Sequence, residues 1–203
     1  MSQIKLYYVY DPMCAWCWGF KPTWQKIKAQ LPKQCDVIYV LGGLAPDSDQ
    51  PMPIQQRQAI ESYWYTITEK LGTEFNHQFW QLNTPRRSTY PSCRAVLAAR
   101  KQDRELQMYA AIQEAYYLQA KNPSDDEILI AAAASIALDI ECFKLDYYSE
   151  TLNQEFGDEL KFARSIGGNS FPSLIVDFNG QFLSLPLDYI NSKSTIDKIK
   201  QLI

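Results

Sequence analysis

Patterns typical of β-strands occur only near the two ends of this chain, and this separation limits how it can fold. Residues 4–10, "IKLYYVY", and residues 36–43, "DVIYVLGG", are rich in β-branched and aromatic residues, with a helical pattern between them. Strand patterns return only at residues 173–178 and 181–185, which an Asn-Gly turn joins into a hairpin. We therefore predict an α/β fold in the order βαβ, a helical block, then ββα, with the first two strands parallel.

The middle of the chain has the pattern of successive helices. Apolar residues recur at helical spacing over residues 54–71, and Gly72 follows as a helix-ending residue. Further on, Ser124 as N-cap and Glu127 three residues later form a capping box. The other predicted helices lie near residues 17–31, 92–101, 106–121, 141–153, 157–166 and 187–202.

These patterns predict one interrupted domain rather than two domains in tandem. The 203 residues are enough for one core and a second, smaller one carried as an insertion. We expect an α/β unit made of residues 1–44 and 167–203. Residues 45–166 form an all-helical insertion, whose last helix packs on that unit.

The composition is that of an ordinary globular protein and argues against nucleic-acid and membrane partners. Apolar residues make up 46%, charged residues 21%, and the net charge is −3, so no basic surface is expected for a phosphate backbone. No apolar run reaches membrane-spanning length, and Lys5 interrupts the N-terminal apolar segment, unlike a signal peptide. We therefore expect a cytoplasmic protein, whose thiols are kept reduced.

Cys14 and Cys17 follow the first predicted strand and admit three interpretations. A zinc site would need a second pair of ligands, but the other three cysteines are isolated and the chain has one histidine. A structural disulfide would close so short a loop that it would constrain the unfolded chain very little. The total of five cysteines is odd, which also argues against a fully paired framework.

The third interpretation, a redox-active pair, fits the position of the two cysteines best. Cys14 falls where the strand gives way to a helix, so its sulfur should face unpaired N–H groups and the positive end of the helix dipole, which favour a thiolate. Cys17 lies one turn further on and should be more buried. The first sulfur would attack a substrate disulfide, and the second would resolve the mixed disulfide.

The segment "DPMCAWCWGF", residues 11–20, resembles the motif of a known family. It is similar to the cytoplasmic FrnE-like branch of the DsbA-like proteins in the thioredoxin superfamily, predicted protein-disulfide isomerases. The resemblance covers the whole chain and implies a thioredoxin fold interrupted by a helical insertion. The residues that match around the cysteines are Asp11, Pro12, Met13, Trp16, Trp18, Gly19 and Phe20.

The family also carries a cis-proline opposite the dithiol, and the resemblance places it at Pro172 of "GGNSFPSLIV". It implies that the backbone of Phe171 lies beside Cys14, where an extended substrate strand can pair with it. We also expect Ala15 and Trp16 to contact substrate, with Trp16 flooring a hydrophobic groove. A trans Pro172 that simply starts a strand is the alternative that position alone permits.

The motif also departs from related proteins. The periplasmic oxidants of the superfamily have a histidine between the cysteines, where this chain has Ala15 and Trp16, so its disulfide should be less oxidising. If Asp11 lies close to Cys14, its charge acts in the same direction. Kappa-class glutathione transferases and chromene-carboxylate isomerases typically have serine in place of the first cysteine. This chain keeps both cysteines, which favours dithiol exchange.

The sequence thus predicts a cytoplasmic thiol–disulfide oxidoreductase or isomerase, with Cys14 as nucleophile and Cys17 as resolving thiol. We expect no metal and no cofactor beyond the dithiol, protein or peptide thiols and disulfides as partners, and glutathione as the co-substrate if one is used. Two alternatives stay open: a glutathione-dependent transferase or isomerase of small molecules, and a non-catalytic peptide-binding chaperone.

The remaining cysteines and the histidine are given structural interpretations. Cys93 is interpreted as a small buried residue on a helix, although a third redox cysteine is conceivable there. Cys35 precedes a strand and Cys142 begins a late helix, and neither is assigned chemistry. His77 is interpreted as a surface or helix-end residue.

Overall fold

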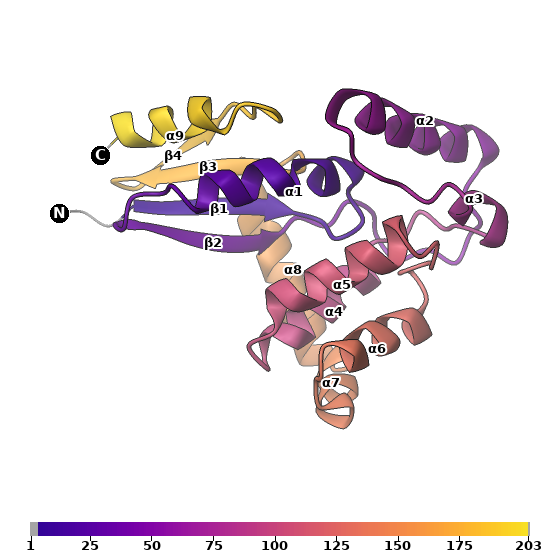
Figure 1. Ribbon diagram of the computed structural model, residues 1–203. Coiled ribbons are helices and arrows are strands. Elements are labelled where there is room, and N and C mark those ends of the chain that lie inside the picture. Colours follow the sequence, from indigo (N-terminus) through magenta and orange to yellow (C-terminus); the bar gives the residue numbers. More distant parts are fainter. Residues whose placement is uncertain (1–3, 203) are drawn as a thin grey trace.

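The computed structural model describes residues 4–202, in which helices cover both faces of a four-stranded sheet (Figure 1). The strand order is β2-β1-β3-β4; β1 runs parallel to β2 and antiparallel to β3, and β4 is antiparallel to β3. The two ends of the chain therefore share one sheet, and the predicted interrupted α/β fold is confirmed. The strands are β1 (Ile4–Tyr10), β2 (Cys35–Leu41), β3 (Ser173–Phe178) and β4 (Gln181–Leu185).

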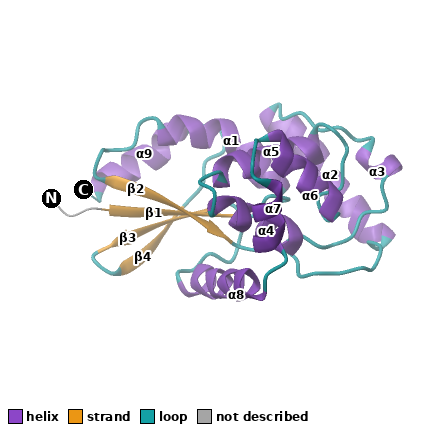
Figure 2. Cartoon of the chain, turned by 90° about the horizontal axis from the view of Figure 1, so that it is seen from below, coloured by secondary structure: helices purple, strands orange, loops and turns teal. Residues whose placement is uncertain are grey.

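The helices divide between the two faces of the sheet and one of its ends. Figure 2 shows α1 and α9 on one side of the sheet and α8 on the other, while α2 to α7 gather beyond the end where β1 finishes. The boundary of the helical insertion stays a prediction. In chain order the helices are α1 (Ala15–Lys28), α2 (Ile54–Leu71), α3 (Phe79–Leu82), α4 (Tyr90–Arg100), α5 (Glu105–Tyr117), α6 (Asp126–Ser135), α7 (Ile140–Tyr147), α8 (Glu150–Ser165) and α9 (Ser192–Gln201).

The central strand β1 is buried on both faces and distributes its aromatic side chains between them. Successive side chains of a strand point to opposite faces. The Tyr8 ring stacks on Trp24 of α1 with 4.6 Å between centroids, whereas Tyr7 meets Phe162 of α8 edge-on at 5.3 Å. This double burial explains why the strand reads as an almost continuous apolar run.

A second cluster of buried aromatic residues holds α2, α3 and α5 together beside the sheet. Trp64 of α2 is fully buried at its centre, with Trp80 at 4.9 Å and Tyr117 at 5.4 Å between ring centroids. Aromatic pairs of this kind add stabilisation beyond the apolar area that they bury. The pairing of rings from three helices gives the helical part a core of its own.

The late helices divide differently from the prediction. The sequence predicts helices near residues 141–153 and 157–166, but the structure has α7 at Ile140–Tyr147 and α8 at Glu150–Ser165. The division falls at Ser149, whose side chain accepts a hydrogen bond from the Leu152 N–H at 3.1 Å and caps α8. Residue 157, where the second predicted range begins, lies inside α8.

The predicted capping box at Ser124 is wrong. The Ser124 hydroxyl is buried and donates to the Ser88 carbonyl at 2.7 Å, so it joins two loops instead of capping a helix. Helix α6 begins two residues later, with Asp125 at the N-cap position. The Asp125 carboxylate also makes no capping bond, because it pairs with Arg86 at 2.5 Å.

The last helix is shorter than predicted. The sequence predicts a helix from about residue 187, but α9 begins at Ser192, after Asn191, whose side chain accepts from the Lys193 N–H. The loop before it is held by Asp188, which accepts from the N–H groups of Ile190 and Asn191. This loop reaches α1, where the Thr23 hydroxyl donates to a backbone carbonyl at residue 189.

Candidate functional site

Cys14 lies at the junction between the loop after β1 and helix α1. It occupies the N-cap position of α1 in an extended conformation, and its carbonyl accepts from the Trp18 N–H at 3.1 Å. The first turn of α1 holds no acidic residue, so the positive end of the helix dipole is not neutralised by its own side chains. Cys14 as a whole is 5% exposed, so it is largely buried but not completely.

Cys17 lies one turn further along α1 and is completely buried. Burial raises the pKa of Cys17 well above the ordinary thiol value, and the hydrogen bond and charge of the neighbouring Cys14 act in the same direction. The two thiols are adjacent and both are free. The pair is therefore asymmetric: Cys14 keeps some exposure at the start of α1, whereas Cys17 is completely buried and its thiol is kept protonated.

The backbone of Phe171 faces the dithiol from the other end of the chain. The Cys14 thiol donates to the Phe171 carbonyl at 3.3 Å. The Phe171–Pro172 peptide bond is cis, and β3 begins at the next residue, Ser173. The structure thus brings Cys14, Cys17 and Phe171 together, as the sequence predicts, while the part that each plays in binding substrate stays a prediction.

Asp11 lies directly beneath this junction with a carboxylate that is completely buried. One oxygen accepts from the Met13 N–H at 2.8 Å, and the other accepts from the Leu44 N–H and the Thr89 hydroxyl, both at 2.6 Å. Burial raises the pKa of the Asp11 carboxyl, although these hydrogen bonds partly oppose the shift. The carboxylate therefore ties the loop before Cys14 to the segments that follow β2 and precede α4.

Four tyrosines surround the two thiols. Burial raises the pKa of each of these phenols, and the charge of the cysteines when ionised adds to the effect. They therefore stay protonated at neutral pH and give the dithiol an apolar, aromatic wall. They come from β1, α5 and the loop before α9: Tyr8, Tyr109, Tyr117 and Tyr189.

The two residues between the cysteines lie at the rim of the site. Ala15 and Trp16 are both half-buried. The Trp16 ring meets Tyr189 edge-on, with 5.1 Å between centroids, and so continues the aromatic wall to the surface. Trp18, one residue beyond Cys17, is also half-buried, and its ring stacks on Tyr117 with 5.6 Å between centroids.

Cys93 of α4 is fully buried, in agreement with its interpretation as a small core residue. It also has a contact that the sequence did not indicate, because its thiol lies 3.5 Å from an Asp11 carboxylate oxygen. Burial, and after it the Asp11 charge, raise the pKa of Cys93 well above the ordinary thiol value. Single-sequence patterns carry no signal for this contact, since the two residues lie far apart in the chain.

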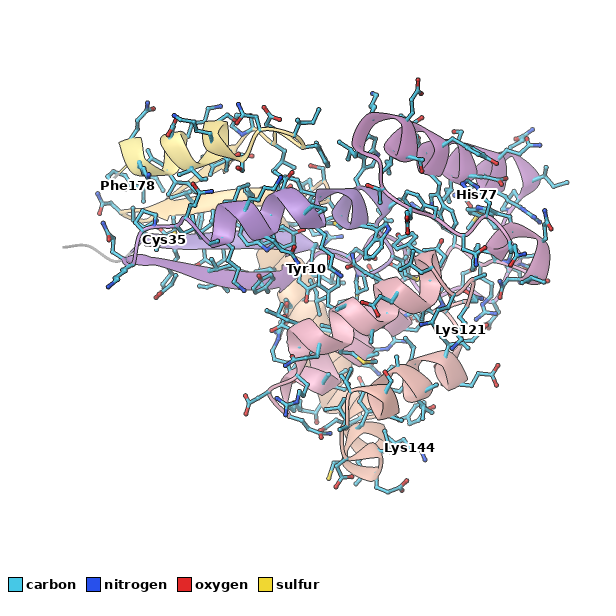
Figure 3. All side chains as sticks on the ribbon, viewed as in Figure 1. Tyr10, Cys35, His77, Lys121, Lys144 and Phe178 are labelled. Atoms are coloured by element: carbon cyan, nitrogen blue, oxygen red, sulfur yellow. The ribbon has the colours of Figure 1, made fainter. Side chains whose placement is uncertain are left out.

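The other candidate residues lie away from the dithiol. Figure 3 shows Cys35 at the start of β2, at the opposite end of the sheet from Tyr10. Cys142 is exposed on α7. His77 stacks on Tyr65 with 4.1 Å between ring centroids, in the segment between α2 and α3.

Within residues 4–202, no cluster of histidine, cysteine and acidic side chains is arranged to hold a metal ion. The helices over the same range include none long and apolar enough to cross a membrane.

One family model matches most of this chain. The family model described as thioredoxin matches residues 7–184, which takes in both cysteines and the segment around Pro172.

The chain is also similar to a protein with a named cellular role. It is 25% identical over 182 residues to the ClpXP adapter protein SpxH of Bacillus subtilis (strain 168), over 88% of this chain and 59% of that protein. An SpxH from Bacillus cereus (strain ATCC 10987) is 26% identical over 180 residues. The chain thus spans about three fifths of the length of these relatives.

Solved structures share the fold over nearly the whole chain. A candidate protein disulfide isomerase from Nitrosomonas europaea superimposes with a TM-score of 0.81 at 24% identity, covering 99% of this chain and 96% of that one. The cytosolic disulfide reductase DsbM from Pseudomonas aeruginosa gives 0.75 at 24% identity, covering 97% and 95%. DsbM has also been solved with GSH, and that structure gives 0.73.

Proposed function

The chain belongs to the thioredoxin family, and from this premise we propose that it is a thiol–disulfide oxidoreductase or isomerase that uses the Cys14-x-x-Cys17 dithiol. The strongest support for this proposal is the position of the two cysteines. Cys14 lies at the N-terminus of α1 with its thiol on the Phe171 carbonyl, and Cys17 lies buried directly behind it.

The unequal burial of the two cysteines supports the following order of steps. In the first, the Cys14 thiolate attacks a substrate disulfide; a mixed disulfide forms, and the departing substrate thiolate takes up a proton. In the second, Cys17 loses its proton and attacks the Cys14 sulfur, which releases the second substrate thiol. The substrate gains two electrons and the protein keeps a Cys14–Cys17 disulfide. The reverse sequence oxidises a dithiol substrate.

The substrate that fits this site is a protein or peptide in extended conformation. The backbone of the half-buried Phe171 lies next to Cys14, where main-chain groups can pair with a substrate strand. Ala15 and Trp16, the half-buried residues that follow Cys14 in α1, would contact the same substrate. Trp16 supplies an apolar surface on which a substrate side chain can pack, since its ring is half-buried.

We propose glutathione as the source of electrons and the cytoplasm as the compartment. Support comes from DsbM, which is described as cytosolic and has been solved with GSH. No further cofactor enters this scheme, because the dithiol itself carries the two electrons.

The test is glutathione-dependent reduction of a protein disulfide by the purified chain and three variants. We expect Cys14→Ser to abolish turnover, and Cys17→Ser to stop turnover while a mixed disulfide at Cys14 accumulates, visible as added mass. Cys142→Ser is the control and should retain full activity, because Cys142 is exposed on α7. If Cys17→Ser left the turnover of a small molecule intact, a glutathione-dependent transferase or isomerase would replace this proposal.

A second candidate function is that of a protein-binding adapter, favoured by the similarity to SpxH. Such a role needs the surface around the dithiol but not the thiols. Binding of purified ClpXP to the chain, measured by calorimetry, would test it. If the chain is an adapter, the wild type and the Cys14→Ser/Cys17→Ser double variant should bind ClpXP equally well. If neither of them binds ClpXP, the adapter role is excluded.

A further inference from the structure

Gly42 follows directly after β2, and the Phe171 ring occupies the position that a side chain on Gly42 would take. A Cβ atom built on Gly42 would lie 1.8 Å from Cε1 of the Phe171 ring, 2.5 Å from Cζ and 2.6 Å from Cδ1. Contacts under 3.0 Å are essentially never made by real Cβ atoms. The three nearest atoms all belong to one ring, so the ring lies directly against the Gly42 backbone.

The backbone of Gly42 is held from two further directions. Its N–H donates to the Tyr10 carbonyl at 2.7 Å, which continues the pairing of β2 with β1. Its carbonyl accepts from Nη1 of Arg164, on α8, at 2.6 Å. Gly42 therefore has little freedom to retreat, and an added side chain would have to displace the ring.

The position of the Phe171 ring matters because the same residue contacts the dithiol. Its carbonyl oxygen accepts from the Cys14 thiol at 3.3 Å. The ring is joined to the carbonyl through Cβ and Cα, so the part of a ring displacement that side-chain rotation does not absorb moves the carbonyl relative to the sulfur. A displacement of about 1 Å at a reacting group can change a rate by as much as about a hundredfold.

We propose that Gly42 is a positioning residue for the dithiol, acting through the Phe171 ring to set the distance between the Phe171 carbonyl and the Cys14 sulfur. This role deepens the proposed oxidoreductase function and rests on it. Gly42 itself does not touch the reacting atoms. The site therefore depends on a residue of the β2 end that the C-x-x-C motif does not include.

The test compares Gly42→Ala in two backgrounds, wild type and Phe171→Ala. The readout is the rate at which Cys14 reacts with a small neutral alkylating reagent, resolved by peptide mass spectrometry. We expect Gly42→Ala to change this rate at least about fivefold in wild type, and to have no effect once the ring is removed. Gly157→Ala is the matched control, since a Cβ atom there meets nothing within 4 Å, and it should leave the rate unchanged.

Thermal unfolding keeps the proposal testable if Gly42→Ala folds poorly. Removing the ring should then restore folding, so that Gly42→Ala/Phe171→Ala matches Phe171→Ala alone. If Gly42→Ala is equally harmful in both backgrounds, or changes nothing in either, Gly42 does not act through Phe171. The alkylation rate does not require a redox activity, so a chain that positions Cys14 in this way yet reduces no disulfide would overturn the proposed function alone.

Discussion

The Thr89 hydroxyl donates a hydrogen bond of 2.6 Å to the Asp11 carboxylate, which joins the loop before Cys14 to the residue that precedes α4. Both residues are almost completely buried. The C-x-x-C segment is therefore held by a contact with the helical part of the chain, in addition to its connection to β1. A buried carboxylate with several donors is a costly feature for a fold to retain, and its ionisation should be measurable.

The first prediction concerns the pH dependence of stability that Asp11 causes. Its folded pKa is raised by burial above the ordinary value of 3.8, so the unfolded chain loses this proton first. The contribution to stability is full below that value and falls as pH rises through the folded pKa. Denaturant unfolding of wild type and Asp11→Asn across pH 4 to 8 should give a free-energy difference, wild type minus variant, that decreases with pH. A constant or growing difference would mean that the pKa of Asp11 is not raised.

The second prediction concerns which thiols react in the reduced protein. Cys142 is exposed and Cys14 keeps 5% exposure, whereas Cys17 and Cys93 are completely buried. The buried pair should be alkylated at least about a hundredfold more slowly, because each must wait for local opening of the fold. Peptide mapping after timed alkylation measures all four rates, and denatured protein, where they should converge, is the control. Equal rates at Cys14 and Cys17 would refute the asymmetry.

The third prediction tests the aromatic core of the helical part. Trp64→Ala should lower the free energy of unfolding by about 3–5 kcal/mol, because a fully buried ring is lost and a cavity remains. Tyr63→Ala is the matched control; that side chain is 51% exposed, and the change should stay within about 0.5 kcal/mol. Denaturant unfolding of both variants measures the two values. Equal losses would show that the cluster around Trp64 does not stabilise the fold.

The fourth prediction compares two adjacent acidic residues of α8. Glu159 accepts from the Leu41 N–H at 2.7 Å and pairs with Arg100 at 2.6 Å, so it joins α8 to the end of β2 and to α4. Glu159→Ala should cost about 2 kcal/mol of unfolding free energy, since the Leu41 N–H loses its acceptor and Arg100 keeps only its pair with Glu105. Asp158→Ala, which breaks an exposed pair with Lys161, should cost no more than about 0.5 kcal/mol. A similar cost for both would mean that the Glu159 contacts add nothing.

Much of the fold could be predicted from the sequence where local patterns decide it. Strands β1, β3 and β4 follow the predicted residues because strong turn signals bound their apolar runs. The turn between β3 and β4 has φ of 53° at Asn179 and 81° at Gly180, as a two-residue hairpin requires. The motif at residues 11–20 also predicted a member of the thioredoxin superfamily, and the match to the thioredoxin model confirms that membership.

The remaining features depend on contacts between distant residues, which a single sequence does not reveal. Ser124 has the local pattern of a cap, but its hydroxyl is taken by the Ser88 carbonyl. The bond between Asp11 and Thr89 joins positions 78 residues apart. The room that Gly42 leaves for Phe171 depends on how β2 and the cis-proline segment meet in space. At each of these positions, the observed contacts come from tertiary packing and not from the local sequence pattern.

The most direct test of the central claim is the reduction potential of the Cys14–Cys17 pair, measured in defined glutathione mixtures by alkylation and mass spectrometry. We predict one reversible two-electron transition that Cys14→Ser removes and Cys142→Ser leaves unchanged. Because no histidine lies between the cysteines, the potential should be more negative than the about −120 mV of the DsbA oxidant. If no reversible Cys14–Cys17 disulfide forms at any glutathione ratio, the account of this protein as a dithiol oxidoreductase is wrong.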